Sequence, residues 1–272
     1  APRSLVYKLV RSGQVRVNGG RAKAERKLEA GDEVRIPPVR LDAPADKGTP
    51  AKGLLAAMEA SIVFEDARLL AINKPSGVAS HGGSGIGFGA IETMRALRPR
   101  DSLELVHRLD RDTSGLLVMA KKRSALTELQ ALMREEGGIS KRYLALLVGR
   151  LPDGTMSVDA PLHVGLRQGG ERHVQVAAEG KASLSHFRAL ERRGGQSYCE
   201  VRIETGRTHQ IRVHLASRGT PCLGDPVYGS GAPAAPVRAA IETAQFSRQA
   251  LHAAVLGFRN YWYPVEWSRK VR

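Results

Sequence analysis

The chain has 272 residues, enough for one large domain and a small second one, and its 42 Lys and Arg against 27 Asp and Glu give a formal charge of +15. Such an excess suits a polyanionic partner, although basic character can also serve solubility. No stretch reaches the roughly 18 to 20 apolar residues of a membrane span, and no apolar signal core opens the chain, so we expect a soluble, cytoplasmic protein. Cys199 and Cys222 form no CxxC pair, which argues against a disulfide framework or a metal site, and we expect both to be buried.

Residues 1–40 have the pattern of a small, strongly basic folded module. They hold ten Lys or Arg against four Asp or Glu. Leu5 and Leu9 lie at helical spacing, and Gly13 fits the position just past the end of a helix. The pair Asn18-Gly19 then predicts a tight turn between two short strands.

This order of helix, turn and strands resembles the S4 RNA-binding module, on the segments SLVYKLVRSGQVRVNG and LEAGDEVRIP. The resemblance implies that the basic helix face and the following loop contact an RNA backbone. It also implies that the opening helix of the module would lie before Ala1. A basic helix face alone is usually just solvated, so the prediction depends on the turn and strands that follow it.

Residues 41–60 are predicted to form a linker. From 39 to 58 the sequence is dominated by Pro, Ala, Asp, Lys and Gly and shows no sustained periodicity. The predicted organisation is therefore an RNA-binding module over 1–40, a linker over 41–60 and a catalytic domain over 61–272.

After the linker, short apolar strands alternate with a few amphipathic helices. Helices are predicted over 91–97 and 125–133, where apolar residues share a face. Strands are predicted over 62–64, 69–72, 116–119, 143–148, 174–176, 184–189, 198–203 and 253–258. This pattern predicts an α+β fold, with helices on the flanks of one large mixed sheet.

The most informative segment is a polar cluster at the entrance of an apolar strand. In ELVHRLDRDTSGLLVMAKK, five polar residues precede the run LLVMA: His107, Arg108, Asp110, Arg111 and Asp112. Charged residues this dense at the entrance of a strand are either solvated or functional. A carboxylate at Asp110 between two arginines would be held ionised, as a nucleophile or base at neutral pH requires. Composition alone leaves a salt-bridged loop as the alternative.

Four motifs, in this order, resemble the ribosomal large-subunit pseudouridine synthase family. They are LLAINKPSGVASHGG, HRLDRDTSGLLV, ISKRYLALLVG and ETGRTHQIRVHLASRGTPCLGDPVYG, and together they span 69–229. The second carries the family pattern H-R-L-D followed after two residues by T-S-G. The resemblance implies the pseudouridine synthase fold, with a mixed, mostly antiparallel sheet flanked by helices, and an isomerase that needs no cofactor.

The resemblance also assigns residues to an active site. It implies Asp110 as the catalytic carboxylate, Tyr143 as the aromatic residue under the target base, and Arg212 as the partner of the aspartate. Arg108 would stand in for the extruded base. The other implied substrate-binding residues are His107, Ile211, Arg207, His209 and Lys74.

These residue types suit the chemistry by themselves. Uridine becomes pseudouridine when the bond between ribose C1′ and base N1 breaks, the base rejoins through C5, and the C5 proton leaves, without oxidation or a group donor. An ionised Asp110 can attack C1′ or remove a sugar proton to give a glycal, and both routes stay open. Arg212 can orient that carboxylate through bidentate pairing. Tyr143 can relay the C5 proton and stack the flipped-out base, a contact worth about 1–3 kcal/mol.

Other interpretations remain open. Residues 85–90 fit the dinucleotide pattern G-x-G-x-x-A and lead into a helix, but no buried strand directly precedes them. A catalytically silent RNA-binding or assembly factor would keep the same fold. Tyr143 and Ile211 could also be ordinary core residues beside solvated charges.

Within the family, the chain most resembles the C branch, which acts on 23S ribosomal RNA. The N-terminal module and the segments HGGSGIGFGAIE and LVHRLDRDTSG carry this likeness. The D branch, which also acts on 23S RNA, and transfer-RNA enzymes share the core motifs. The predicted partner is therefore 23S ribosomal RNA or a large-subunit assembly intermediate, and the predicted oligomeric state is a monomer.

Overall fold

The computed structural model describes residues 3–39, 48–83, 86–135, 137–166, 172–229 and 235–258. The chain divides into two compact units, Ala1–Gly48 and Thr49–Arg272, which are described separately. Within the described ranges, none of the helices combines the length and the apolar character that crossing a bilayer requires.

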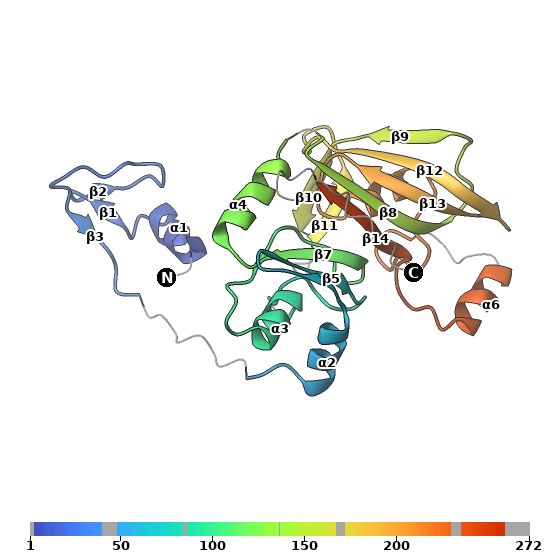
Figure 1. Ribbon diagram of the computed structural model, residues 1–272. Helices are drawn as coiled ribbons and strands as arrows, with labels where there is room; N and C mark the ends of the chain where they lie inside the picture. Colours follow the sequence, from blue (N-terminus) through green and yellow to red (C-terminus); the bar gives the residue numbers. More distant parts are fainter. Residues whose placement is uncertain are drawn as a thin grey trace. The chain divides into compact units, whose positions relative to one another are not determined.

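The N-terminal unit is a helix followed by three short strands (Figure 1). Its described elements are α1 (Arg3–Arg11), β1 (Arg16–Val17), β2 (Gly20–Arg21) and β3 (Val34–Arg35), with the strands in the order β2-β1-β3. Gly13, just past the helix, has a left-handed backbone with φ of 72°. Asn18 and Gly19 between β1 and β2 are also left-handed, with φ of 51° and 78°. The predicted helix end and tight turn are therefore confirmed.

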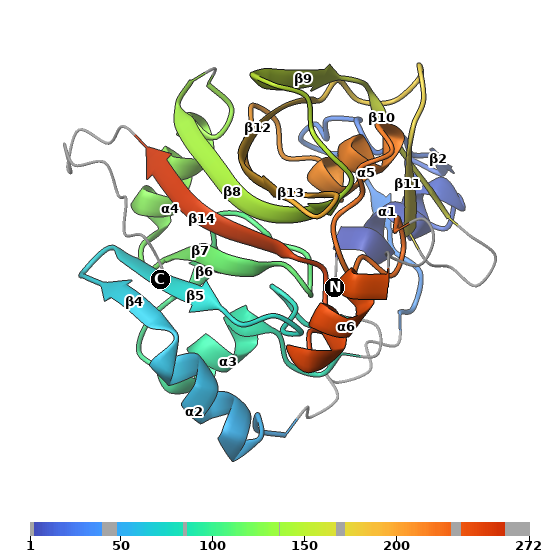
Figure 2. The ribbon, with the colours of Figure 1, turned by 90° about the vertical axis from the view of Figure 1, so that its right-hand side faces the viewer.

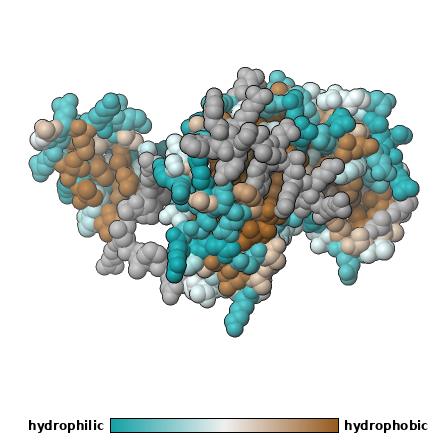
Figure 3. All heavy atoms as spheres, in the orientation of Figure 1, coloured by the Kyte–Doolittle hydropathy of each residue, from teal (hydrophilic) through white to brown (hydrophobic). Residues whose placement is uncertain are grey.

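This N-terminal unit has a small interior. Val17 is buried, whereas Leu28 and Ile36 remain exposed, and Figure 3 shows apolar residues gathered on the visible face of the unit. Because few apolar side chains are buried in this unit, side-chain hydrogen bonds help to fix its turn. The Asn18 side chain donates to Asp32 at 2.7 Å and accepts the N–H of Glu33 at 2.8 Å, so the residue that makes the turn also ties it to the strand β3.

The second unit is built on one large sheet (Figures 1 and 2). Its described elements are α2 (Lys52–Ala60), β4 (Ile62–Glu65), β5 (Leu69–Lys74), α3 (Ala90–Leu97), β6 (Glu104–Leu105), β7 (Ser114–Ala120), α4 (Arg123–Leu132), β8 (Ile139–Val148), β9 (Thr155–Asp159), β10 (Leu162–Leu166), β11 (Arg172–Val176), β12 (Leu184–Arg193), β13 (Gln196–Ile203), α5 (Gln210–Ser217), α6 (Ala235–Thr243) and β14 (Leu251–Phe258). The strand order is β4-β5-β7-β14-β8-β13-β12-β9, with β6 paired to β7.

The pairing of the described strands confirms the predicted mixed, mostly antiparallel sheet. The neighbouring pairs are antiparallel except for β7 and β14, which run parallel. Figure 2 shows β14 lying between β7 and β8. β10 and β11 form a separate antiparallel hairpin. The predicted α+β class is therefore correct.

Helices cover both faces of the sheet around β7. All seven residues of β7 are buried, as its continuous apolar run predicts. Leu117 and Met119 pack in one cluster with residues of α2 and α3, and Leu116 and Val118 pack in another with residues of α4. Burial of each such side chain contributes about 1.5–3 kcal/mol, so β7 and the loop that enters it are firmly placed.

The predicted linker over 41–60 is wrong in its second half. Residues 52–60 form the helix α2, whose Met58 is fully buried in the core of the second unit. The helix escaped the sequence analysis because its Ala and Gly positions leave weak periodicity. The first half of the linker, 40–47, lies outside the described residues.

The helix α5 was also not predicted. Six of its eight residues, 210–215, are buried, so it has no polar face and no amphipathic period to reveal it. Its alternating Ile211, Val213 and Leu215 resemble a strand instead. The strands β9 and β10 and the helix α6 were missed as well, because they are short and carry weak patterns.

A close approach between β7 and β14 fixes the loop that follows Asp110. Gly115 has φ of 114°, and a Cβ added there would lie 2.3 Å from the carbonyl oxygen of Ala253. Thr113 accepts a hydrogen bond from the Gln249 side chain at 2.7 Å. The T-S-G part of the motif therefore anchors the loop to the entrance of β14.

Replacing Gly115 with Ala should lower the free energy of unfolding by about 2–5 kcal/mol. Roughly 1–2 kcal/mol would come from the unfavourable backbone and about 1–3 kcal/mol from overpacking against Ala253. Gly154→Ala is the matched control, because Gly154 also has positive φ, 77°, but nothing lies within 4 Å of an added Cβ. Urea denaturation would measure both, and equal losses would contradict the close-approach argument.

Candidate active site

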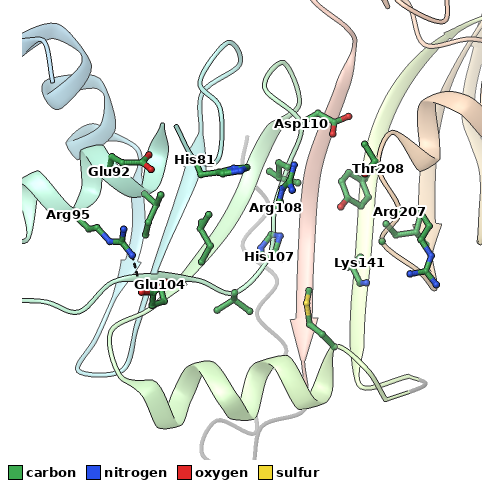
Figure 4. A pocket seen from close by; sticks show the side chains of 18 residues that line it. His81, Glu92, Arg95, Glu104, His107, Arg108, Asp110, Lys141, Arg207 and Thr208 are labelled. Carbon is green, nitrogen blue, oxygen red and sulfur yellow. Dashed lines mark ion pairs between the residues drawn. The ribbon is translucent and has the colours of Figure 1, made fainter. Parts of the chain in front are cut away.

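An open pocket of about 730 Å³ lies beside the polar cluster of the HRLD segment. In Figure 4, the side chains of His107 and Arg108 lie between a group on or near α3 and a group that includes Lys141 and Arg207. A smaller pocket of about 80 Å³, the inner pocket, adjoins it and is lined by Asp110, Tyr143 and Arg212 together. The three stretches predicted to form the active site therefore converge.

The buried side chain of Arg212 contacts the carboxylate of Asp110. Its Nη1 donates to Asp110 Oδ2 at 3.3 Å. The Arg212 side chain is 6% exposed and that of Asp110 is 28% exposed, so a buried cation faces a carboxylate that solvent and substrate can reach. The predicted pairing is present, but it is a single hydrogen bond and not the bidentate fork that we expected.

The bidentate partner of Arg212 is Asp225. Arg212 Nε donates to Asp225 Oδ2 at 2.6 Å and Nη2 donates to Asp225 Oδ1 at 2.8 Å. Asp225 Oδ1 also accepts the backbone N–H groups of Val227 and Tyr228. The motifs assigned no role to Asp225, although it lies in the segment GDPVYG of the fourth motif.

Tyr143 lies on β8 with its ring at the junction of the two pockets. It is half-buried and packs against two core clusters, so it serves both the core and the pocket lining. Burial, and then the charge of Asp110, raise the pKa of Tyr143 well above its ordinary value. The phenol therefore stays protonated at neutral pH.

His107 and Arg108 have different environments. His107 Nε2 accepts the backbone N–H of Val118 at 3.2 Å, and burial lowers the pKa of His107 to about 4, with Lys141 adding to the effect. This neutral ring lines the pocket while anchoring its loop to β7. Arg108 is exposed and lines both pockets.

The residues of the fourth motif surround the inner pocket. Ile211 is buried in the core and lines this pocket, and Arg207 is exposed at its mouth, where its Nε donates to Ala182 O at 3.1 Å. His209 Nε2 lies 3.9 Å from Asp110 Oδ2. These three of the predicted substrate-binding residues therefore line the inner pocket.

The prediction of a substrate contact for Lys74 is wrong. Its side chain is fully buried, and its ammonium donates to the carbonyl oxygens of Pro75, Val78 and Arg111 at 3.0, 2.6 and 2.9 Å. Burial lowers the pKa of Lys74 to about 8, although Asp112 and Asp110 act in the opposite direction. Lys74 ties the first motif to the loop of the second and has no donor left for RNA.

The arginines next to Asp110 in sequence are not its ion-pair partners. Arg111 donates to Asp112 at 3.2 Å instead. The ion pair that the structure shows for Asp110 comes from Arg212, about a hundred residues away in sequence, and the ring of His209 lies 3.9 Å from the same carboxylate oxygen. The expectation that flanking arginines hold Asp110 ionised is therefore corrected.

The glycine-rich segment before α3 does not leave a phosphate site. Glu92 Oε2 accepts the N–H groups of Gly82 and Gly89 at 2.9 Å each, so the carboxylate occupies donors that a phosphate would need. A Cβ at Gly89 would lie 2.5 Å from the His81 backbone, which explains that glycine by packing. Gly85 of the dinucleotide pattern lies outside the described residues.

No group of three or more His, Cys, Asp and Glu in the described part of the chain is arranged to hold a metal ion. The two cysteines are buried and unpaired, as expected from the sequence. Burial raises the pKa of Cys199 to about 12, so its thiol stays protonated at neutral pH.

Replacing Asp225 with Asn should destabilise the protein by about 3–5 kcal/mol and lower activity, because it leaves the buried Arg212 cation without its bidentate partner. Asp153→Asn is the matched control: Asp153 pairs with Arg192 at 3.1 Å but is fully exposed, so solvent screens the pair. Urea denaturation would measure both variants, and equal effects would contradict the argument.

The same substitution should change the dependence of stability on pH. Burial raises the pKa of Asp225, but hydrogen bonds from Arg212 and two backbone N–H groups outweigh it and hold the pKa below its ordinary value of 3.8. The stabilisation is therefore complete above that ordinary value and is lost as the pH falls through the lowered one. Asp225→Asn should remove this part of the acid sensitivity.

Comparisons with known proteins agree with this geometry. Residues 68–217 match the family described as RNA pseudouridylate synthase, and residues 1–34 match the S4 domain. The chain is 51% identical over 230 residues to ribosomal large subunit pseudouridine synthase C of Escherichia coli (strain K12), covering 84% of this chain and 72% of that protein. Its counterpart in Vibrio cholerae serotype O1 is 48% identical over 263 residues, covering 94% and 80%.

Two solved human structures share the fold, each with a TM-score of 0.62. Human RNA Pseudouridylate Synthase Domain Containing 1 is 27% identical and covers 77% of this chain and 82% of its own. Human RNA Pseudouridylate Synthase Domain Containing 4 is 24% identical and covers 75% and 86%. Similarity of this extent, with the motifs lying around one pocket, shows that the chain belongs to the RNA pseudouridylate synthase family of isomerases.

Proposed function

We propose that the chain isomerises specific uridines of 23S ribosomal RNA to pseudouridine, with Asp110 as the catalytic carboxylate and without a cofactor. The observation that carries this proposal is the position of Asp110. Its carboxylate lines both the open pocket of about 730 Å³ and the inner pocket, 3.3 Å from the buried Arg212. The ribose of an extruded nucleotide that enters the inner pocket would meet this carboxylate.

Arg212 prepares Asp110 for the reaction. A guanidinium that is already anchored by Asp225 donates a hydrogen bond to the Asp110 carboxylate and limits its rotation. Either route of the reaction, attack on C1′ or removal of a ribose proton, needs a carboxylate in this state. Because the cation is fixed before substrate binds, no reorganisation is required when charge develops on the sugar.

Tyr143 and Ile211 would hold the base while its glycosidic bond is broken. The ring of Tyr143 and the apolar side chain of Ile211 line the same inner pocket. Stacking on an aromatic ring is worth about 1–3 kcal/mol and is tolerant of the rotation that brings C5 to the sugar. The raised pKa disfavours the phenolate, so the phenol would relay the C5 proton by passing its own proton to a base such as Asp110 as it takes up the C5 proton.

The open pocket of about 730 Å³, the outer pocket, supplies positive charge for the RNA backbone. Arg95, Arg108, Lys141 and Arg207 line it, together with Glu92 and Glu104. Arg108 is exposed at the entrance of the inner pocket, which suits the proposed role of replacing the extruded base in its stack. His107, Arg207 and His209 are proposed to contact the substrate around this opening.

The likeness to ribosomal large subunit pseudouridine synthase C supports 23S ribosomal RNA as the substrate. The S4 domain supports RNA binding by the N-terminal unit, and we propose that residues 1–40 contribute affinity or site choice. The acceptor is ribosomal RNA, free or in an assembling large subunit. The enzyme is proposed to act as a monomer in the cytoplasm.

Asp110→Asn should abolish turnover while leaving RNA binding nearly unchanged. Release of tritium from 23S ribosomal RNA labelled at uridine C5 should fall by at least about 10³-fold, because the amide cannot act as nucleophile or base. Affinity for the same RNA should change only a few fold, and the Asp153→Asn control should react at the rate of the wild type. A wild-type protein that binds RNA but releases no tritium would identify a catalytically silent assembly factor.

Cells that lack the gene should lose pseudouridine at particular positions of 23S ribosomal RNA. Mapping of pseudouridines in total RNA would identify these positions. Restoring the wild-type gene should return them, and the Asp110→Asn gene should not. Loss of pseudouridine from transfer RNA, with 23S RNA intact, would show the same chemistry on a different substrate.

A further inference from the structure

We infer that Tyr228 is a positioning residue for the reaction: its hydroxyl fixes the ring of His209 so that a ring N–H faces the carboxylate of Asp110. The inference rests on the proposed function and adds a group that neither the motifs nor the family resemblance assigned. Tyr228 itself need not touch the substrate, because it acts through His209.

The hydrogen bonds of the Tyr228 hydroxyl set the direction of its proton. The backbone N–H of Val174 donates to the Tyr228 oxygen at 3.1 Å, and His209 Nδ1 lies 2.8 Å from the same oxygen. A backbone N–H can only donate, so the oxygen accepts there, and we assign its own proton to the hydrogen bond with His209 Nδ1. The neutral ring then carries its proton on Nε2, the atom that lies 3.9 Å from Asp110 Oδ2.

The backbone of His209 shows that its position is imposed. Its φ of 52° is left-handed, a conformation that is strained for a non-glycine residue and persists where the surroundings hold it. His209 directly precedes α5, and this conformation accompanies a ring that reaches Tyr228 and Asp110 at its two nitrogens. The strain therefore occurs at the residue whose ring orientation matters.

Tyr228 also contacts Arg212, the cation that faces Asp110. The guanidinium carbon of Arg212 lies 5.0 Å from the centroid of the Tyr228 ring, a cation–π contact. The backbone N–H of Tyr228 donates to Asp225 Oδ1 at 3.0 Å, so the aspartate that anchors Arg212 anchors Tyr228 as well. One side chain thus contacts both groups that approach the catalytic carboxylate.

The charge state of His209 would decide how available Asp110 is. A neutral His209 ring adds no second ion pair to the Asp110 carboxylate. An imidazolium would form such an ion pair and weaken Asp110 as a nucleophile or base. Burial lowers the pKa of His209, and the charge of Asp110 opposes this. The titratable and charged groups that face the ring are Asp110, Arg212, Asp225, His173 and Tyr228.

A hydrogen bond donated to Nδ1 stabilises the neutral ring further. Removing the hydroxyl should therefore raise the pKa of His209 and increase the protonated fraction at any given acidic pH. Activity would then begin to fall at a higher pH. A role of Tyr228 in folding alone would lower the amount of active enzyme without moving this acid limb.

The test is the pH profile of tritium release by Tyr228→Phe under single-turnover conditions at saturating C5-labelled RNA. The Phe ring keeps its place over Arg212 and lacks only the hydroxyl. The rate at neutral pH should fall about tenfold, the size of one lost hydrogen bond, with RNA affinity unchanged and the acid limb moved to higher pH. Tyr198→Phe, another half-buried tyrosine, is the matched control and should leave rate and profile unchanged.

A second variant separates action through His209 from any other effect. In His209→Gln the titrating ring is gone, so adding Tyr228→Phe should produce no further change in the acid limb. An additional shift in the double variant would overturn the inference. An active wild-type enzyme whose acid limb is unmoved by Tyr228→Phe would also overturn it, whereas an inactive wild type would count against the proposed function instead.

A measurement on the unaltered chain covers the case in which Tyr228→Phe does not fold. The ¹⁵N chemical shifts of the His209 ring nitrogens report which of them carries the proton. At neutral pH, Nε2 should be protonated and Nδ1 should be an acceptor. A proton on Nδ1 would overturn the inference whether or not the chain is active.

Discussion

The active site depends on one buried cation, the guanidinium of Arg212. A charge removed from water is tolerated only when its donors are paired, and here Asp225 takes two of them in a fully buried bidentate contact. One donor remains directed at Asp110, which is itself 28% exposed. The arrangement places a fixed positive charge beneath a reachable carboxylate. Its orientation therefore comes from a structural ion pair that the substrate never needs to touch.

The sheet explains how distant segments meet at this cation. β14, the last strand described, inserts between β7 and β8, and its Ala253 lies opposite both Gly115 and Tyr143 in the strand register. Gly115 follows the loop of Asp110, so one residue of β14 sets the spacing between the aspartate loop and the tyrosine. The glycine at that crossing has no room for a side chain. The geometry of the proposed active site is thus a consequence of strand order.

The sequence motifs predicted most of this site, and burial explains what they missed. Asp110, Tyr143 and Arg212 were identified because their motifs fix residue type and order, and most predicted strands follow from apolar runs. Asp225 was overlooked because a pairing between a loop and a buried helix leaves no local pattern. Lys74 was assigned to RNA through the resemblance, and nothing local in the sequence reveals its burial, which is rare for a lysine. The helix α5 was hidden for a related reason, since burial on all sides removes the periodicity that reveals a helix.

The partners of each polar group show which ones are free to bind RNA. Lys74 donates to three carbonyls and His107 accepts a strand N–H, so both belong to the frame of the site. Arg108 and Arg207 are exposed at the pocket, where a guanidinium can meet a phosphate or a base. The frame and the proposed RNA-binding surface are thus different sets of residues, although the sequence mixes them within single motifs. Because the frame is complete without RNA, binding strength can vary at the surface while the geometry around Asp110 stays fixed.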